Sequence, residues 1–325
     1  MRTLLVTTLF VPLLFCFLYA QKSTDYAVYH KTVLSVEELI VEEDYNKALD
    51  QMEYLSAAYD FVFLKEYKIA TQLAIYIKDF DRAFKFLKLG VSNGWTLKEM
   101  RKNNFLKPLT AMEEWSSIVA DYAVLRTEYE KRIDDDLRNE VYAMYKKDQK
   151  FAIKHLLKIG QKAKERHGSE KGEPHTRQQI AKLKAMLKSK GYPSEKNIGE
   201  SQWMTIILAH HNSLSKAFVV NDTLYPTLRP ELLKAISNGE MSPYDFAFIE
   251  DWKIAVGSDR QDSGYGYLDV PTQEELPKTN ALRRKLNMRS IATRNGLVVI
   301  QEKTGMNFYL AGAPWVEGKI VVRNE

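Results

Sequence analysis

The chain has 325 residues, a formal net charge of +5 and a single cysteine. This length is ample for a buried hydrophobic core and predicts two domains. So small an excess of positive charge points to no particular partner, and aromatic residues are not interleaved with basic ones as in proteins that bind nucleic acid. We therefore expect no nucleic-acid partner.

Residues 1–20 have the organisation of a signal peptide. Arg2 precedes an almost uninterrupted apolar run, Leu4–Tyr19, and a polar chain follows Ala20. This order predicts cleavage near Ala20 and a periplasmic or secreted protein. The run is short for a membrane span and lacks a basic stop-transfer flank, so we expect no transmembrane segment after its removal. Retention as an anchor stays open, because Leu18 is large for a residue three positions before the cut.

The only cysteine, Cys16, lies inside this apolar run. A lipoprotein is less favoured than a cleaved protein, because Phe15 is bulkier than the residue that usually precedes a lipid-bearing cysteine. Once the signal peptide is removed, the chain has no cysteine. Disulfides, thiolate metal sites and cysteine nucleophiles are then excluded.

Two segments repeat thirty-five residues apart, Asp44–Leu49 and Asp79–Phe84. A period of this length is typical of stacked helical hairpins, and each copy places a small alanine on the buried face. The pattern resembles a tetratricopeptide repeat over about residues 26–120. We expect a helical repeat domain at 21–125 that binds a protein or peptide, with Trp95 and Trp115 in its core.

Residues 126–288 predict a second helical domain, and residues 289–325 predict a β-rich tail. The helical segments expected here begin or lie at Asp134–Asp136, Thr176–Gly191, Ser201–His211, Pro226–Ile236 and Ser242–Asp251. A polar loop is expected at 167–174. Short β-prone runs at Leu297–Ile300, Phe308–Leu310 and Ile320–Val322 predict a small C-terminal meander. The fold class is therefore mainly α, with helical hairpins, a second helical domain and a terminal β-meander.

The stretch from Lys146 to Lys196 is strongly basic, with fifteen Lys or Arg against five Asp or Glu. A solvated helical face explains such a stretch, and so does contact with an anionic partner such as lipid headgroups or an acidic polymer. Both interpretations stay open.

Most polar groups that helix packing does not explain lie between Gly191 and Tyr267. His211 is on an apolar helix and needs a polar partner, for which Glu250 and Asp251 are the candidates. His210 is turned about 100° away on the same helix and serves a different place. A structural role and a role in catalysis or binding both stay open for His211. No histidine spacing typical of a metal site occurs, so we expect no metal and no cofactor.

A glycine- and tyrosine-rich segment, Gly264–Tyr267, follows these carboxylates. Glycines free the backbone and tyrosines offer flat amphipathic faces, which suits either gripping a sugar or peptide or covering a core. The candidate ligand-binding residues are Tyr192, Arg260, Tyr265 and Gly266, and the candidate catalytic residues are His211, Glu200 and Asp251.

Ordered short motifs across about Asp136–Met288 resemble the bacterial domain of unknown function family 6624. The resemblance implies a shared fold and pocket and no particular reaction. It points to Asp148, Gln149, Gly191, Pro193, Gly199, Glu200, His211, Asp251 and the Tyr265–Gly266 pair. The family pattern has glutamine where this chain has His210, and arginine where it has Trp252, so the arginine's role passes to Arg260 or stays vacant.

These observations favour an exported bacterial adaptor or scaffold whose repeats bind a protein or peptide. The alternative is a cell-envelope hydrolase acting on a glycan or peptide. There His211 is the acid or base, Glu200 or Asp251 orients it, and Arg260 holds an anion.

Overall fold

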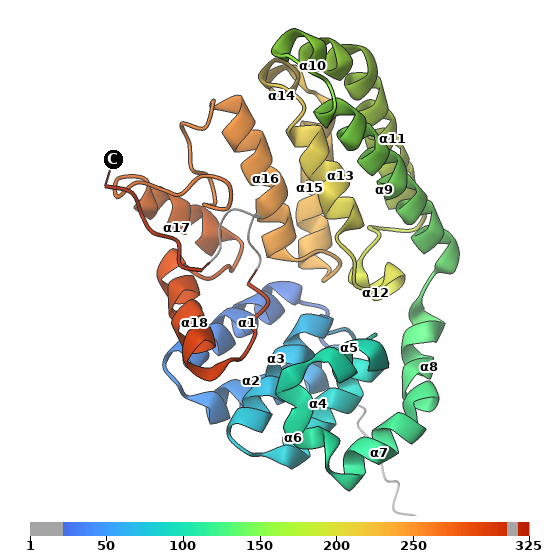
Figure 1. Ribbon diagram of the computed structural model, residues 1–325, viewed down its shortest axis with the longest axis vertical. Coiled ribbons are helices and arrows are strands. Elements are labelled where there is room, and N and C mark those ends of the chain that lie inside the picture. The colour runs from blue at the N-terminus through green and yellow to red at the C-terminus, as the bar shows by residue number, and fades with distance from the viewer. Residues whose placement is uncertain (1–21, 311–317, 325) are drawn as a thin grey trace, which may run out of the picture.

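The computed structural model describes residues 22–310 and 318–324, and over these the chain is mainly helical, as predicted. The predicted signal peptide lies outside the described residues. The helices form two lobes, with α8 joining them on one side and α17 and α18 running back on the other (Figure 1). None of the described helices is both long and apolar enough to cross a membrane.

The first lobe is built from the predicted N-terminal helices. Its elements are α1 Tyr26–Val41, α2 Tyr45–Ala58, α3 Leu64–Tyr76, α4 Phe80–Ser92, α5 Leu97–Lys102, the 3₁₀ turn η1 Asn104–Leu106, α6 Lys107–Thr110 and α7 Glu113–Ala120. Trp95 and Trp115 are buried in its core, as predicted.

The repeated sequence corresponds to a repeated turn and helix start. α1 packs on α2 and α3 on α4, and the side chains of Asp44 and Asp79 cap the second helix of each pair. The residue before each cap has a left-handed backbone, with φ of 61° at Glu43 and 63° at Lys78. Such a turn reverses the chain within a few residues and brings consecutive helices together.

The second lobe has a separate hydrophobic core. Its elements are α9 Asp135–Leu156, α10 Gln161–His167, the π-helix η2 Gly168–Gly172, α11 Glu173–Ser189, α12 Glu195–Ile198, α13 Trp203–Asn212, α14 Lys216–Asn221, α15 Leu224–Ser237 and α16 Pro243–Gly257, and α8 Tyr122–Arg132 leads into it.

The expected polar loop at 167–174 is helical instead. Gly172 has helical dihedrals, and a Cβ there would approach side-chain carbons of Leu214 and Phe151 to 2.7 and 2.9 Å. The glycine is therefore needed for close packing and does not break the helix. Pro174 follows at the start of α11, where proline is tolerated because its missing N–H has no helical partner.

The predicted C-terminal β-meander is wrong. α17 spans Leu276–Lys285 and α18 spans Ile291–Thr304, and the described residues contain no strand, only an isolated bridge between Thr272 and Arg323. Ser290 caps α18 by accepting a hydrogen bond from the Thr293 backbone, and a left-handed Gly305 ends it. β-Branched residues favour strands, but their burial against another helix overrides that preference.

α18 completes the core of the first lobe. Leu297 and Ile300 join the hydrophobic cluster formed by α1–α7, and Gly296 lies against Val41 of α1. Lys303 forms an ion pair with Glu43 on the surface of the same contact. The first lobe therefore contains segments from both the start and the end of the described chain.

Candidate functional site

His211 lies inside the second lobe, and both of its ring nitrogens are hydrogen-bonded. Nδ1 is 2.8 Å from the Thr176 hydroxyl oxygen, and Nε2 is 2.8 Å from Oδ2 of Asp222. The side chain is 1 % exposed. The expectation of a Glu250 or Asp251 partner is therefore wrong, because the segment joining α14 to α15 brings Asp222 to the ring first.

Asp222 has a second structural task. Its carboxylate accepts hydrogen bonds from the backbone N–H groups of Leu224 and Tyr225 at the start of α15. Burial raises the pKa of Asp222, but the bonds from His211 and from these backbone groups outweigh it and lower the pKa to about 2. The pair joins α13 to α15, and His211 has no open ring nitrogen for a ligand.

Glu250 and Asp251 are engaged elsewhere. Glu250 accepts from the Tyr225 hydroxyl at 2.7 Å and from Nε of Arg229 at 2.8 Å. Asp251 accepts from the backbone N–H groups of Tyr265 at 2.5 Å and Tyr267 at 2.6 Å. Burial raises the pKa of Asp251 to about 7 even against these bonds.

The glycine- and tyrosine-rich segment covers the core. Tyr265 and Tyr267 are buried, and Gly266 has a left-handed backbone with φ of 77°. Arg260 lies on the surface, where its Nη1 is 2.9 Å from Oδ1 of Asp269. These residues thus do not converge with His211 on a common opening.

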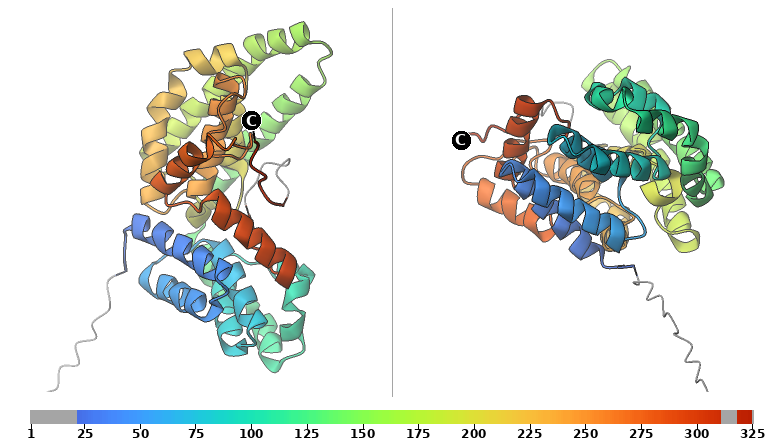
Figure 2. Two further views of the ribbon diagram at one scale, coloured as in Figure 1. Left: turned by 90° about the vertical axis from the view of Figure 1, so that its left-hand side faces the viewer. Right: turned by 90° about the horizontal axis from the view of Figure 1, so that it is seen from below.

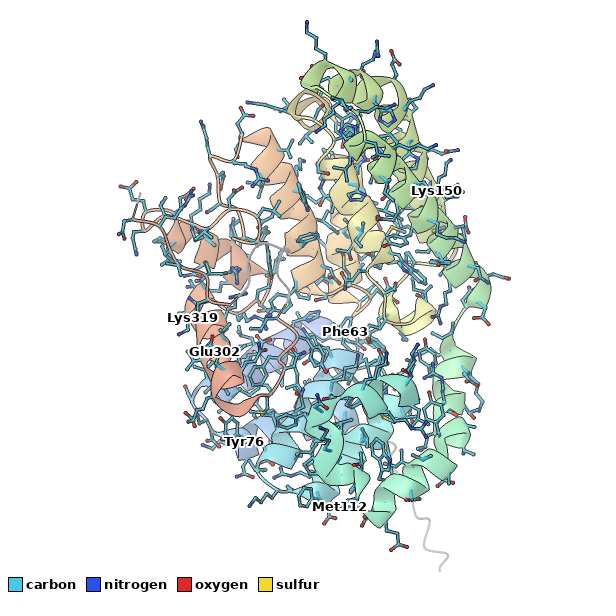
Figure 3. All side chains as sticks on the ribbon, viewed as in Figure 1. Phe63, Tyr76, Met112, Lys150, Glu302 and Lys319 are labelled. Carbon is cyan, nitrogen blue, oxygen red and sulfur yellow. The ribbon has the colours of Figure 1, made fainter. Side chains whose placement is uncertain are left out.

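Three of the predicted residues, Tyr192, Pro193 and Glu200, instead line a cavity of about 180 Å³ between the two lobes. The first lobe contributes residues of α1 and of the start of α3, among them Phe63, which lies between the lobes in Figure 3. The second lobe contributes two segments, 192–205 and 240–245. Arg289 and Tyr309 close the cavity.

Among the charged residues that line this cavity, carboxyl groups outnumber cations. Those lining it are Glu66, Glu195, Glu200, Glu240 and Asp245, against Lys65 and Arg289 as the lining cations. Burial raises the pKa of Glu195 to about 8 and that of Asp245 to about 6. Glu195 therefore holds its proton near neutral pH, whereas Asp245 takes one up only below it, because burial outweighs the attraction of Lys65 for the charged form of each group.

Glu195 and Asp245 have neutral partners. Oε1 of Glu195 accepts a hydrogen bond from the backbone N–H of Leu64 at 2.6 Å, and the side chain of Gln202 donates to Asp245. Among the described residues, neither carboxyl group belongs to an ion pair. Each is thus available to a positively charged ligand.

The cations around the cavity are already neutralised. Nζ of Lys68 is 2.7 Å from Oε2 of Glu200, and Nη1 of Arg289 is in close contact with Glu37. Nζ of Lys65 lies 3.5 Å from Oε1 of Glu66. These pairs leave little positive charge to attract an anionic ligand.

Aromatic rings form much of the wall. Tyr29, Tyr192, Tyr244 and Tyr309 all face the cavity. His30 joins them as a neutral ring, because burial lowers its pKa to about 4. Aromatic rings beside carboxyl groups suit a cation, because the negative face of an aromatic ring attracts positive charge.

The sequence did identify neighbours of the two central carboxyl groups. Tyr192 lies three positions before Glu195, and the Ser242–Pro243 helix start lies just before Asp245. The sequence pattern does not show the contribution of the first lobe, because Leu64 comes to lie against Glu195 only in the folded protein. Among the described residues, no group of three His, Cys, Asp or Glu side chains is placed to hold a metal ion.

No family model matches the chain, and neither a curated protein nor a solved structure is found to be similar to it. The resemblances to tetratricopeptide repeats and to the domain of unknown function family 6624 therefore stay predictions.

Proposed function

We propose that this chain is an exported adaptor that captures a positively charged group of a peptide or protein in the cavity between its lobes. The tetratricopeptide-like hairpins supply one wall, and the family-6624-like domain supplies the other. The observation that carries the proposal is the presence of Glu195 and Asp245 in the lining of one aromatic cavity, where neither belongs to an ion pair with another described residue.

The binding energy would come from exchanging protons for a cation. An ammonium or guanidinium group entering the cavity stabilises the charged form of both carboxyl groups, so their pKa values fall and Glu195 releases its proton near neutral pH. The tyrosine rings add cation–π attraction and exclude water, which strengthens the ion pairs. A chain with a lysine or arginine side chain, or a free amino terminus, meets these requirements.

The alternative of a cell-envelope hydrolase centred on His211 has less support. A general base needs a nitrogen that reaches the substrate, whereas both nitrogens of His211 are bonded within the core. Arg260, its proposed anion holder, is paired with Asp269 on the surface.

Calorimetry with N-acetyl-lysine N-methylamide tests the proposal, with the norleucine analogue as an uncharged ligand of similar shape. We expect the lysine compound to bind and to release protons near pH 7, detected as a heat that changes with the ionisation enthalpy of the buffer. The norleucine compound should not bind.

The double change Glu195→Gln and Asp245→Asn should lower the affinity at least tenfold and abolish proton release. Glu114→Gln, an exposed change on α7, is the matched control. Equal binding of both ligands, or undiminished binding and proton release by the double variant, would refute the proposal.

A further inference from the structure

A second surface lies far from the cavity, at the hairpin formed by the end of α9 and by α10. We call residues 150–166 the tip. It exposes four large aliphatic side chains, with exposed fractions of 56 % for Ile153, 73 % for Leu156 and Leu157, and 94 % for Ile159. They are the only leucines and isoleucines among the described residues that are classed as exposed. Exposed apolar side chains are usually scattered singly over a protein surface, so a cluster of four indicates an interaction surface.

The tip is also the most basic part of the hairpin. Its charged residues are Lys150, Lys154, Lys158, Lys162, Lys164 and Arg166, with Glu165 as its acidic residue. Lys150 lies on the outer side of α9 (Figure 3). No ion pair joins any of these six cations to another described residue, and the pairs nearest along α9 are those of Asp148 with His175 and His210.

Helical spacing keeps the two kinds of side chain in adjacent stripes. Lys150 and Lys154 lie four residues apart on α9, and Ile153 and the capping residue Leu157 form a neighbouring row; Lys158 follows just beyond the end of the helix. Gly160, with φ of 84°, then turns the chain into α10. The hairpin extends from one side of the molecule in Figure 2, so other helices do not cover its end.

The base of the hairpin is held in place by ring stacking. The ring of Phe151 stacks on His167 with centroids 5.0 Å apart and on His175 with centroids 5.2 Å apart. Asp148 of α9 also accepts a hydrogen bond from Nδ1 of His210 at 2.5 Å, which joins α9 to α13. The apolar end is therefore presented by an ordered support and needs no rearrangement to meet a flat surface.

We propose that the tip docks on an anionic lipid bilayer, with the four aliphatic side chains in the boundary between headgroups and acyl chains and the lysines among the phosphates. The aliphatic side chains and the lysines both contribute to such attachment, since the free energies of apolar burial and of attraction to anionic lipid add together. A soluble acidic polymer would satisfy the lysines and leave the leucines in water. An anionic bilayer satisfies both.

A shallow hollow on the α10 side fits this arrangement. Ile159, Gly160, Lys162, Ala163 and Arg166 line it. Two cations beside a glycine provide charge and close backbone approach, which suits a phosphate headgroup.

Vesicle sedimentation with the full chain tests the proposal. Wild-type protein should bind vesicles of phosphatidylcholine mixed with phosphatidylglycerol and should bind pure phosphatidylcholine weakly, with affinity falling as salt increases. Lys154→Gln with Lys158→Gln should weaken binding to the anionic vesicles by about 25-fold, from roughly fivefold per lysine. Leu156→Gln with Leu157→Gln should weaken it at least tenfold.

Val124→Gln, an equally exposed apolar position on α8, is the control and should bind as the wild type does. All variants share the N-terminal apolar run, so differences among them report on the tip alone. Circular dichroism melts identify any variant that fails to fold. Equal vesicle binding by wild type and both double variants would overturn the proposal. Binding to soluble heparin that is insensitive to the leucine changes, without binding to vesicles, would also overturn it in favour of an acidic polymer.

Discussion

Replacing Glu195 by glutamine should make the protein more stable at alkaline pH. The folded protein holds the Glu195 proton up to a pKa of about 8, whereas the ordinary value near 4.5 applies to the unfolded chain. Between these values the folded state binds the extra proton, so the free energy of unfolding falls as pH rises. Glutamine cannot ionise, yet its amide oxygen keeps an acceptor for the Leu64 backbone.

The rise in the pKa of Glu195 sets an upper bound of about 5 kcal/mol on the free energy of unfolding that the wild type loses as pH rises. Glu195 is partly open to water in the cavity, so solvent screening reduces this, and we expect about 2 kcal/mol. Wild type and Glu195→Gln should therefore be similarly stable below pH ~4.5 and diverge up to pH ~8, with no further divergence above it.

Urea unfolding followed by tryptophan fluorescence at a series of pH values measures this difference. Asp245 and Asp251 titrate in the same window, so the comparison must be made between the two proteins and not from the wild-type curve alone. Glu114→Gln is the exposed control. Parallel curves for wild type and Glu195→Gln across the whole window would show that Glu195 is already ionised near neutral pH, and the reasoning about the cavity would fail.

His211→Ala should lower the free energy of unfolding by about 3 kcal/mol, because it leaves Asp222 and the Thr176 hydroxyl buried without their partner. Lysine-ligand binding at the cavity should be unchanged, and a loss of binding without a loss of stability in thermal melts would contradict the structural role. Gly296→Val should separate α18 from α1, since even a Cβ there would come within 2.6 Å of a Val41 methyl. Limited proteolysis should then cut near α18 faster than in wild type, and an unchanged cleavage pattern would contradict this contact.

Local chemistry explains what the sequence could predict. The turn residues and the caps at Asp44 and Asp79 act within a few positions, so their pattern is visible without knowledge of the fold. The buried role of Trp95 follows equally from its size and from the apolar residues around it. The mainly helical fold class could likewise be predicted from local patterns alone.

The errors depend on contacts that the pattern of neighbouring residues does not show. Leu297–Ile300 has the composition of a strand, and α1, more than two hundred residues earlier, gives it a surface to cover as a helix. His211 was matched with the wrong carboxylate because Asp222, eleven residues away, caps α15 and points back at the ring. The cavity could not be predicted from the sequence, because its walls come from separate lobes.

The return of α18 to α1 constrains the order in which the protein folds. The core of the first lobe contains Tyr26 near one end and Phe308 near the other, so it stays incomplete until almost the entire chain is present. Contacts of such large sequence separation slow folding, because a long loop must close before they form. During synthesis the second lobe can bury its own core while the first lobe still exposes the side of α1 that α18 covers in the complete fold. A chain arrested or cut before residue 291 would leave that apolar side uncovered and prone to association with other chains.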